Sequence, residues 1–329
     1  MLNLKHELTS YMNFITGKKL LLMIMPSPPM YGKVLICDPV DSIMIDKLKD
    51  KFEIDYKPAI SPKELLSAIE DYDVVVVRSR TKITKDIIAN GKKLKIIARA
   101  GIGVDNIDTD YAEEKHIKVV YAPGSSTESV VEITLAMMVI GARSLYKGIE
   151  NTKKNDFTKL KGIELEGKTL GILGFGRIGK AIVDASRTFK MKFIAYDPMP
   201  VEYPEYVKKV SLEELLKESD VISINVTMRK DSPYILNDPD LAKLKDGVII
   251  VNTSRARAIN GKDMLKYLKN GKISAFVSDV FWDEPAKEDY EIEMLKLDNV
   301  MITPHLGAQT REAQKRIAIM TADNIINEW

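Results

Sequence analysis

The segment "TLGILGFGRIGKAIVDASRTF" (Thr169 to Phe189) decides the fold of its half of the chain. An apolar run leads into Gly174, Gly176 and Gly179, which form a Gly-x-Gly-x-x-Gly pattern and open a helical segment. The first glycine permits a tight turn, the second lets backbone N–H groups approach a pyrophosphate, and the third lets the helix pack close to the strand. The helix N-terminus adds partial positive charge. The segment therefore predicts a strand–turn–helix unit that binds a dinucleotide.

An acidic residue follows this unit at the spacing that ribose binding requires. The next apolar run ends in "AYDP", which places Asp197 18 residues after Gly179. A carboxylate there accepts hydrogen bonds from the adenosine ribose and repels a 2′-phosphate, so we expect NAD rather than NADP. The alternative is a glycine turn followed by an unrelated surface aspartate. Strand, glycine spacing, helix and acid occur together here, which favours the cofactor site.

Short β-branched runs alternate with amphipathic segments on both sides of this motif. They lie at 33–38, 52–57, 73–79, 94–100 and 117–122, and then at 169–175, 192–197, 220–226, 247–254, 273–281 and 299–304. Continuous apolar runs separated by helices indicate parallel strands that are covered on both faces. Capping boxes at Ser61 and Ser211, each with a glutamate three residues later, mark two helix starts. We expect an α/β protein with two doubly wound parallel-sheet domains of Rossmann or flavodoxin type and a cleft between them.

The region between the two alternations contains a long helical pattern, "STESVVEITLAMMVIGARSL" (Ser126 to Leu145). Its apolar residues occupy more than one face, so we expect the helix to be buried between domains or subunits. The polar stretch 151–168 is then expected to connect it to the second alternation.

The composition limits the classes of partner. A chain of 329 residues suits two domains, and its net charge of +2, from 49 basic and 47 acidic residues, shows no basic stripe of the kind that binds nucleic acid. The single cysteine, Cys37, excludes a disulfide framework and a multi-cysteine metal site, and we expect no metal and a reducing cytoplasm. Residues 1–29 are expected to be an extension. Their apolar run, 20–25, is too short for a signal peptide or a membrane span.

His305, in "ITPHLGAQTREA" (Ile302 to Ala313), is the candidate proton carrier. Hydride exchange with an alcohol or ketone needs an acid or base that works near neutral pH, and histidine suits both roles. The residue directly follows an apolar strand, and ligands of open α/β sheets bind beyond the carboxyl ends of strands. The alternative is a polar residue in a turn.

Two further charged residues follow strands of the same expected sheet. Glu284 in "DVFWDEP" would stabilise the protonated form of a nearby imidazole. Arg255 in "VNTSRARAI" offers the bidentate cation that a substrate carboxylate prefers. Either residue alone would be read as a solvated surface charge. Their convergence on one sheet edge makes them candidates.

With these residues in place, the chain resembles the D-isomer-specific 2-hydroxyacid dehydrogenase family over nearly all of residues 31–329. The matching motifs are "RAGIGVDNID" (99–108), "APGSSTESVVE" (122–132), "LGFGRIGKAI" (173–182), "DGVIIVNTSR" (246–255), "SDVFWDEP" (278–285) and "TPHLGAQTREA" (303–313). The resemblance implies that His305 is the general acid/base and Glu284 its pairing carboxylate. Arg255 would then hold the substrate carboxylate and polarise its carbonyl group.

The resemblance also implies a cofactor site and a domain arrangement. Residues 30–128 and 306–329 would form the substrate-binding domain and residues 129–305 the NAD-binding domain, with catalysis between them and hinge closure excluding water. We expect a homodimer in which the helix after Ser126 lies in the interface. Asp279 would contact the nicotinamide end of NAD. The full set of expected cofactor contacts is Gly174, Gly176, Arg177, Ile178, Gly179, Asp197, Thr253 and Asp279.

Within the family, the closest likeness is to members that oxidise D-3-phosphoglycerate to 3-phosphohydroxypyruvate for serine synthesis. In "VVVRSRTKIT" (75–84), Arg78 and Ser79 would meet the phosphorylated substrate, and Gly103 would offer its backbone N–H to the substrate carboxylate. The alternatives are a glyoxylate or hydroxypyruvate reductase, in which the same loop binds an unphosphorylated acid, and an NAD(H)-sensing binding protein. The intact trio of Arg255, Glu284 and His305 argues against a purely binding role.

The sequence departs from the family pattern at a few positions. Ala256 replaces the usual glycine after Arg255, and Ser126 replaces the asparagine common among phosphoglycerate-oxidising members. Asn225-Val226-Thr227 replaces a His-x-Pro motif. The chain ends at Trp329 before the ACT-type regulatory domain of longer relatives, so we expect no serine feedback through such a domain.

Overall fold

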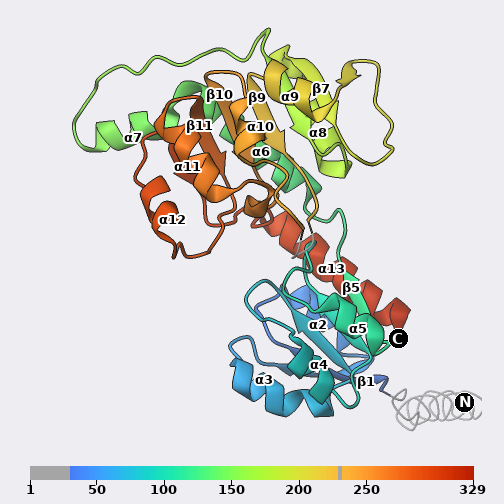
Figure 1. The fold of residues 1–329 in the computed structure, drawn as a ribbon. Helices are drawn as coiled ribbons and strands as arrows, with labels where there is room; N and C mark the ends of the chain where they lie inside the picture. The colour runs from blue at the N-terminus through green and yellow to red at the C-terminus, as the bar shows by residue number, and fades with distance from the viewer. Residues whose placement is uncertain (1–29, 229–231) are drawn as a thin grey trace, which may run out of the picture.

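The computed structural model describes residues 30–228 and 232–329 (Figure 1). The predicted extension 1–29 lies outside the described residues. Two parallel sheets, with the strand orders β2-β1-β3-β4-β5 and β12-β11-β10-β9-β6-β7-β8, confirm the predicted α/β class. Each sheet is covered by helices on both faces, as its apolar strands require.

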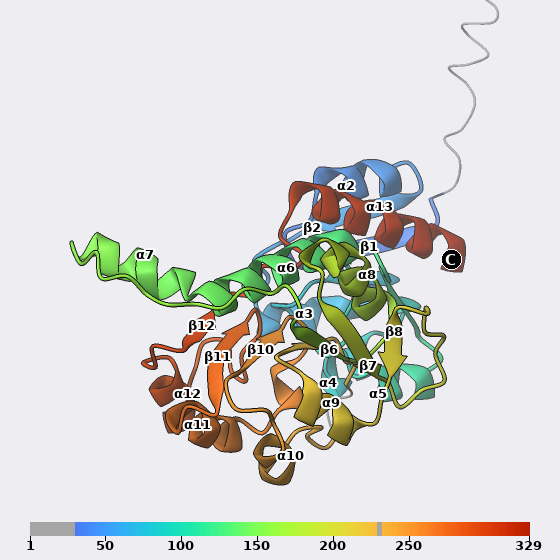
Figure 2. The ribbon, with the colours of Figure 1, turned by 90° about the horizontal axis from the view of Figure 1, so that it is seen from above.

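The first sheet is built largely from the N-terminal third of the chain. Its strands are β1 (Gly32–Ile36), β2 (Phe52–Tyr56), β3 (Val74–Val77), β4 (Ile96–Arg99) and β5 (Lys118–Tyr121). Its helices are α2 (Ser42–Leu48), α3 (Pro62–Ala68), α4 (Lys85–Asn90), α5 (Thr109–Glu114) and the C-terminal α13 (Arg311–Glu328). Helices α2 and α13 pack on one face and α3 to α5 on the other, each through its own apolar cluster (Figure 2).

The second sheet has seven strands, and the glycine motif lies at the carboxyl end of β6, next to the central strand β9. The strands are β6 (Thr169–Leu173), β7 (Lys192–Tyr196), β8 (Val207–Lys209), β9 (Val221–Ile224), β10 (Val248–Asn252), β11 (Ile273–Ser278) and β12 (Val300–Ile302). The helices are α6 (Thr127–Arg143), α7 (Leu145–Lys153), α8 (Arg177–Ser186), α9 (Leu212–Glu218), α10 (Asp238–Ala242), α11 (Gly261–Lys269) and α12 (Asp289–Met294). Short 3-10 turns occupy Ile69–Asp71, Arg187–Phe189 and Ala256–Ala258.

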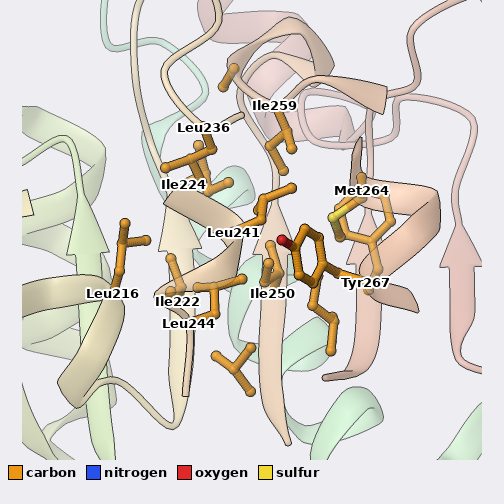
Figure 3. Packing of buried hydrophobic residues seen from close by; sticks show 14 of the residues in the cluster. Leu216, Ile222, Ile224, Leu236, Leu241, Leu244, Ile250, Ile259, Met264 and Tyr267 are labelled. Carbon is orange, nitrogen blue, oxygen red and sulfur yellow. The ribbon is translucent and has the colours of Figure 1, made fainter. Parts of the chain in front are cut away.

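Each face of the second sheet has its own buried cluster. On one face, side chains of α9, α10 and α11 interdigitate with those of β9 and β10, with Leu241 and Met264 against Ile222 and Ile250 (Figure 3). Helices α6 and α8 cover the opposite face. This packing holds the carboxyl ends of the strands, where the predicted site residues lie, on a rigid support.

The two predicted capping boxes are confirmed. The Ser61 hydroxyl accepts a hydrogen bond from the backbone N–H of Glu64 (3.3 Å), and the Glu64 carboxylate accepts one from the backbone N–H of Ser61 (2.9 Å). Ser211 and Glu214 repeat the arrangement at 3.2 and 2.8 Å. Both pairs fix the point at which a helix begins.

The segment after Arg143 differs from expectation. Helix α7 extends to Lys153, so it includes the start of the polar stretch predicted as a connection, and Figure 2 shows it projecting from the body of the molecule. None of the residues of α7 is buried in the described structure, and the helix presents only a short apolar pattern. Helix α6 buries Met137 and Met138 against the second sheet. Among the described helices, none is by itself long and apolar enough to cross a membrane. Only α6 and α7 taken together, with a bend of 69° between them, meet both criteria.

The chain passes between the two sheets twice, from β5 to α6 and from β12 to α13. The two passages are hydrogen-bonded to each other. The Ser129 and Thr310 hydroxyls lie 2.7 Å apart, and the Arg316 Nε donates to the Ser125 carbonyl at 2.8 Å. Hydrogen bonds therefore hold together the two chain segments that connect the domains.

Candidate active site

The three predicted catalytic residues follow three adjacent strands. Arg255 follows β10, Glu284 follows β11 and His305 follows β12, so the loops that carry them emerge from one sheet edge. The Nδ1 atom of His305 lies 3.4 Å from a carboxylate oxygen of Glu284. His305 has a φ of +56°, in the left-handed region, which turns the chain directly after the strand. The structure thus brings the predicted histidine and glutamate together.

The Glu284 carboxyl group is held in its charged form. Burial raises its pKa, but a hydrogen bond with His305, another from the Phe281 N–H (3.1 Å) and the positive charges of His305 and Arg255 outweigh this effect. The net pKa is below the usual value for glutamate. A fixed negative charge therefore faces the imidazole.

The Arg255 guanidinium is bound by Asp105, which lies in a loop of the first sheet. Its Nε and Nη2 donate to the two carboxylate oxygens of Asp105, at 3.2 and 2.7 Å, and its Nη1 donates to the Ser254 carbonyl at 2.8 Å. Asp105 lies in the loop after β4. Gly103 of the same loop lies so close that a Cβ atom would be 2.1 Å from Nη2 of Arg255. The carboxyl ends of the two sheets therefore meet at Arg255.

Asp279 binds the loop that carries His305. Its side chain is buried and accepts hydrogen bonds from the backbone N–H groups of Leu306 and Gly307, both at 2.7 Å, and from the Thr303 hydroxyl at 2.5 Å. The sequence predicts a cofactor contact for this residue. The structure shows that its carboxylate also fixes the segment 303–307.

The glycine loop has the geometry that a pyrophosphate needs. Gly174 has a φ of +92°, and a Cβ atom there would lie 2.6 Å from the Asn225 carbonyl oxygen. At Gly179 a Cβ atom would lie 2.3 Å from the Gly174 carbonyl oxygen, so this glycine allows the helix to approach the strand. At Gly176, which caps α8, a Cβ atom would meet nothing within 4 Å, so open space lies before the helix N-terminus. The loop fits a dinucleotide.

The remaining predicted cofactor residues lie around this loop. Asp197 follows β7, and its carboxylate accepts hydrogen bonds from the backbone N–H groups of Phe175 (2.8 Å) and Met199 (2.9 Å). Arg177 and Ile178 form the first turn of α8, where Arg177 is exposed. The Thr253 hydroxyl, beyond β10, lies 3.0 Å from the Thr134 hydroxyl of α6.

The two arginines of "RSRT" have different environments. The backbone N–H of Arg78 donates to the buried carboxylate of Asp38 at 2.6 Å, and its Nη1 donates to the Pro39 carbonyl at 3.2 Å. The Arg80 guanidinium instead binds Asp38, at 2.8 Å, and several backbone carbonyls. Ser79 is exposed between them. Arg80 therefore fixes the loop, whereas the Arg78 guanidinium makes fewer hydrogen bonds to the described residues and has N–H groups available for a ligand.

Arg99 is a further candidate site residue that the sequence did not predict. It ends β4 and pairs in register with Val77, directly before Arg78. Burial, and then the positive charges of Arg78 and Arg255, lower its pKa to about 10, although Asp105 and Asp38 oppose the shift. Its Nε is buried without a hydrogen-bond partner among the described residues. The available signal was its place at the end of an apolar strand, opening the motif "RAGIGVDNID".

Comparisons with known proteins show which proteins the chain is similar to. A family model described as "D-isomer specific 2-hydroxyacid dehydrogenase, NAD binding domain" matches residues 135–307. A hydroxypyruvate reductase of Thermotoga maritima is 44% identical over 299 residues, covering 90% of this chain and 98% of its own. A D-3-phosphoglycerate dehydrogenase of Methanocaldococcus jannaschii is 42% identical over 299 residues, and the match covers 89% of this chain. The chain spans only 56% of that relative's length.

A solved structure extends the likeness to the fold. The D-lactate dehydrogenase of Aquifex aeolicus, in complex with NAD and lactic acid, superposes with a TM-score of 0.78 at 29% identity. The superposition covers 89% of this chain and 94% of that one. Both predicted domains therefore take part in the match.

Proposed function

Because the chain belongs to the D-isomer-specific 2-hydroxyacid dehydrogenase family, whose members are NAD-dependent oxidoreductases, we propose that it oxidises D-3-phosphoglycerate to 3-phosphohydroxypyruvate. The observation that carries the choice of substrate is the arginine pair Arg78 and Arg99. NAD, when bound, accepts the hydride from C2 of the substrate. Gly176 and the N-terminus of α8 would hold its pyrophosphate, and Asp197 its ribose.

The substrate carboxylate and the reacting oxygen would be bound by Arg255 and His305. A guanidinium fork binds a carboxylate through two parallel hydrogen bonds, and the same positive charge polarises the adjacent carbonyl group. His305 would accept the hydroxyl proton during oxidation and return it during reduction. Glu284, 3.4 Å from the imidazole, stabilises the protonated ring that forms.

The phosphate would lie between Arg78 and Arg99. Two neighbouring guanidinium groups, one of them partly buried with an unsatisfied Nε, repel each other until an anion lies between them. A dianionic phosphate supplies that charge and enough oxygens to accept several N–H groups. The arginine pair thus favours a substrate with an anion in addition to its carboxylate.

A second candidate, hydroxypyruvate reductase, is supported by a different observation. The hydroxypyruvate reductase relative is 44% identical to this chain over 299 residues, slightly more than the 42% of the D-3-phosphoglycerate dehydrogenase relative. In that reaction the arginine pair would bind the substrate hydroxyl or a solvent anion. The two functions share Arg255, Glu284 and His305, so only the substrate separates them.

The deciding experiment measures steady-state NADH oxidation with phosphohydroxypyruvate, hydroxypyruvate and glyoxylate. We expect kcat/KM to be about 100-fold higher for the phosphorylated acid, because charged hydrogen bonds contribute roughly 1.5–3 kcal/mol each. Arg99→Met should remove that preference, and Arg187→Met, an exposed arginine of the NAD-binding domain, should preserve it. Equal kcat/KM with and without the phosphate would select the reductase instead.

The homodimer is part of the same proposal. Helix α7 projects from the body and exposes Leu145 and Ile149, and Phe157 follows with 74% of its surface exposed (Figure 2). Apolar surface on a projecting element is typical of an interface between subunits. A monomer in sedimentation analysis would contradict this part. A role in serine synthesis and a cytoplasmic location also stay predictions.

A further inference from the structure

Asp105 makes the most specific contact between the two domains. Its two carboxylate oxygens bind the Nε and Nη2 atoms of Arg255, so the carboxylate engages the guanidinium from the side. The two residues are 150 positions apart and follow strands of different sheets, β4 and β10. No motif analysis pairs them, because the contact exists only when the sheets face each other.

The geometry leaves a defined part of the guanidinium free. An arginine side chain has five N–H groups. Asp105 uses the Nε–H and one N–H of Nη2, and the Ser254 carbonyl uses one N–H of Nη1. One N–H on each terminal nitrogen therefore stays available to a second acceptor such as a carboxylate.

The loop of Asp105 also limits where the guanidinium can lie. A Cβ atom on Gly103 would lie 2.1 Å from Nη2 and 3.3 Å from Cζ of Arg255, so the backbone of this loop packs directly against the Nη2 end of the guanidinium group. Gly103 and Asp105 together define both the position and the rotation of the group. An arginine side chain without such contacts would lose rotamer freedom only when substrate bound.

We infer that Asp105 is the positioning residue of Arg255: it holds the guanidinium side-on so that the available N–H groups point to the substrate carboxylate. This inference rests on the proposed role of Arg255. Asp105 acts through the arginine, across the boundary between the domains, and does not itself bind substrate. Because both charges are partly solvated, the pair contributes little to stability, and its effect is on orientation.

The opposite role makes a contrasting prediction. If Asp105 competed with the substrate for Arg255, its removal would free the cation and lower KM. If it orients Arg255, its removal raises KM and lowers kcat/KM. The sign of the change in KM therefore separates the two roles.

The test compares Asp105→Asn with Asp108→Asn. Asp108 lies in the same loop and caps α5 by accepting a hydrogen bond from the Tyr111 N–H, a role that asparagine can fill. For Asp105→Asn we expect kcat/KM to fall about 10- to 100-fold, mainly through KM, as the loss of a positioned charged contact implies. NAD affinity and the unfolding midpoint should be unchanged, and Asp108→Asn should match the parent chain in all three measurements.

A double-mutant cycle shows whether Asp105 acts through Arg255. Single-turnover assays with enzyme in excess keep the rates of Arg255→Ala measurable. In that background Asp105→Asn should cause no further loss. An equal loss in both backgrounds, or a lower KM for Asp105→Asn, would overturn the inference.

The design also separates this inference from the proposed function. Phosphohydroxypyruvate and hydroxypyruvate carry the same carboxylate, so Asp105→Asn should affect both to the same degree. A missing preference for phosphate would defeat only the choice of substrate. Full activity of Arg255→Ala would defeat the proposed role of Arg255 itself.

Discussion

Asp279 fixes the backbone position of His305. The φ of +56° at His305 is unfavourable for a residue with a Cβ atom, by roughly 1–2 kcal/mol. The hydrogen bonds from Leu306, Gly307 and Thr303 to the buried Asp279 carboxylate offset this energy, because they bind the chain on both sides of the turn. The imidazole is thus held at the end of β12 before any ligand arrives.

The charge of Glu284 should set the pH range of the reduction. Its pKa lies below the usual value, so the carboxylate stays ionised throughout the assay range. A negative charge beside the imidazole favours the protonated ring, which donates the proton in reduction. For Glu284→Gln we therefore expect the alkaline limb of the kcat/KM profile to move to lower pH. The measurement is the pH dependence of NADH oxidation.

The control for this prediction is Glu293→Gln, a surface glutamate of α12 paired with Lys269. It should leave the pH profile unchanged. A profile for Glu284→Gln that coincides with that of the parent chain would show that Glu284 does not act on the proton carrier.

Which of these residues a sequence can reveal depends on how local their environment is. His305, Glu284 and Arg255 are predictable because each lies in the loop after an apolar strand of one sheet, and parallel strands align their carboxyl ends. Arg99 and Asp105 are not, because their surroundings come from segments far along the chain. The loop-holding contacts of Asp279 depend on the path of residues 303–307, which no spacing rule specifies.

At the scale of elements, the strand–turn–helix unit of β6 and α8 shows two separate uses of glycine. Gly179 lies inside the helix against the strand end, and Gly176 faces open space at the helix N-terminus. Gly179 is therefore needed for the packing of the helix on the strand, and Gly176 for the binding of the cofactor. Alanine at the two positions should separate these uses.

We expect Gly179→Ala to lose stability and Gly176→Ala to lose affinity for NADH. In Gly179→Ala the new Cβ would lie 2.3 Å from the Gly174 carbonyl oxygen and 2.9 Å from Ile172, and the resulting strain should lower stability by about 1–3 kcal/mol. In Gly176→Ala the Cβ meets no protein atom, so the unfolding midpoint should be preserved while the Kd for NADH rises. Thermal unfolding and NADH titration measure the two quantities. Equal loss of stability in both variants would contradict the assignment.

The predictability of elements follows the strength of their local signals. The helices starting after Ser61 and Ser211 could be predicted because a capping box is complete within four residues. Strand β8, with three residues, and helix α7, without buried residues, lack such signals. Their conformations depend on pairing with β7 and on continuity with α6, which are not visible in short windows of sequence.

At the scale of the whole molecule, each sheet has an independent core on each face. The first domain is closed by α13, whose Ile317, Ala318 and Ile325 pack into the cluster around β1 and α2. The sequence shows that α13 is a helix, but its place on the first sheet followed from family resemblance, since nothing in its own residues specifies the sheet on which it packs. Besides the Asp105–Arg255 contact, the two domains are joined through the pair of chain passages around Ser129 and Thr310.

Separate cores predict separate unfolding, and the two tryptophans report on different domains. Trp282 packs against Phe276 and Phe281 in the second domain, and Trp329 stacks on Tyr31 in the first. NAD at about 100 times its Kd should stabilise the domain that binds it by about 2.7 kcal/mol, which for a domain of this size raises the midpoint by about 5–10 °C. In Trp329→Phe, where only Trp282 reports, the fluorescence midpoint should rise by this amount. In Trp282→Phe the midpoint should stay constant, because the glycine loop and Asp197 belong to the second domain alone.

A common shift of the midpoint in both variants would mean that the hydrogen-bonded passages couple the domains into one cooperative unit. Arg316→Ala removes the hydrogen bond to the Ser125 carbonyl and should then restore two separate transitions.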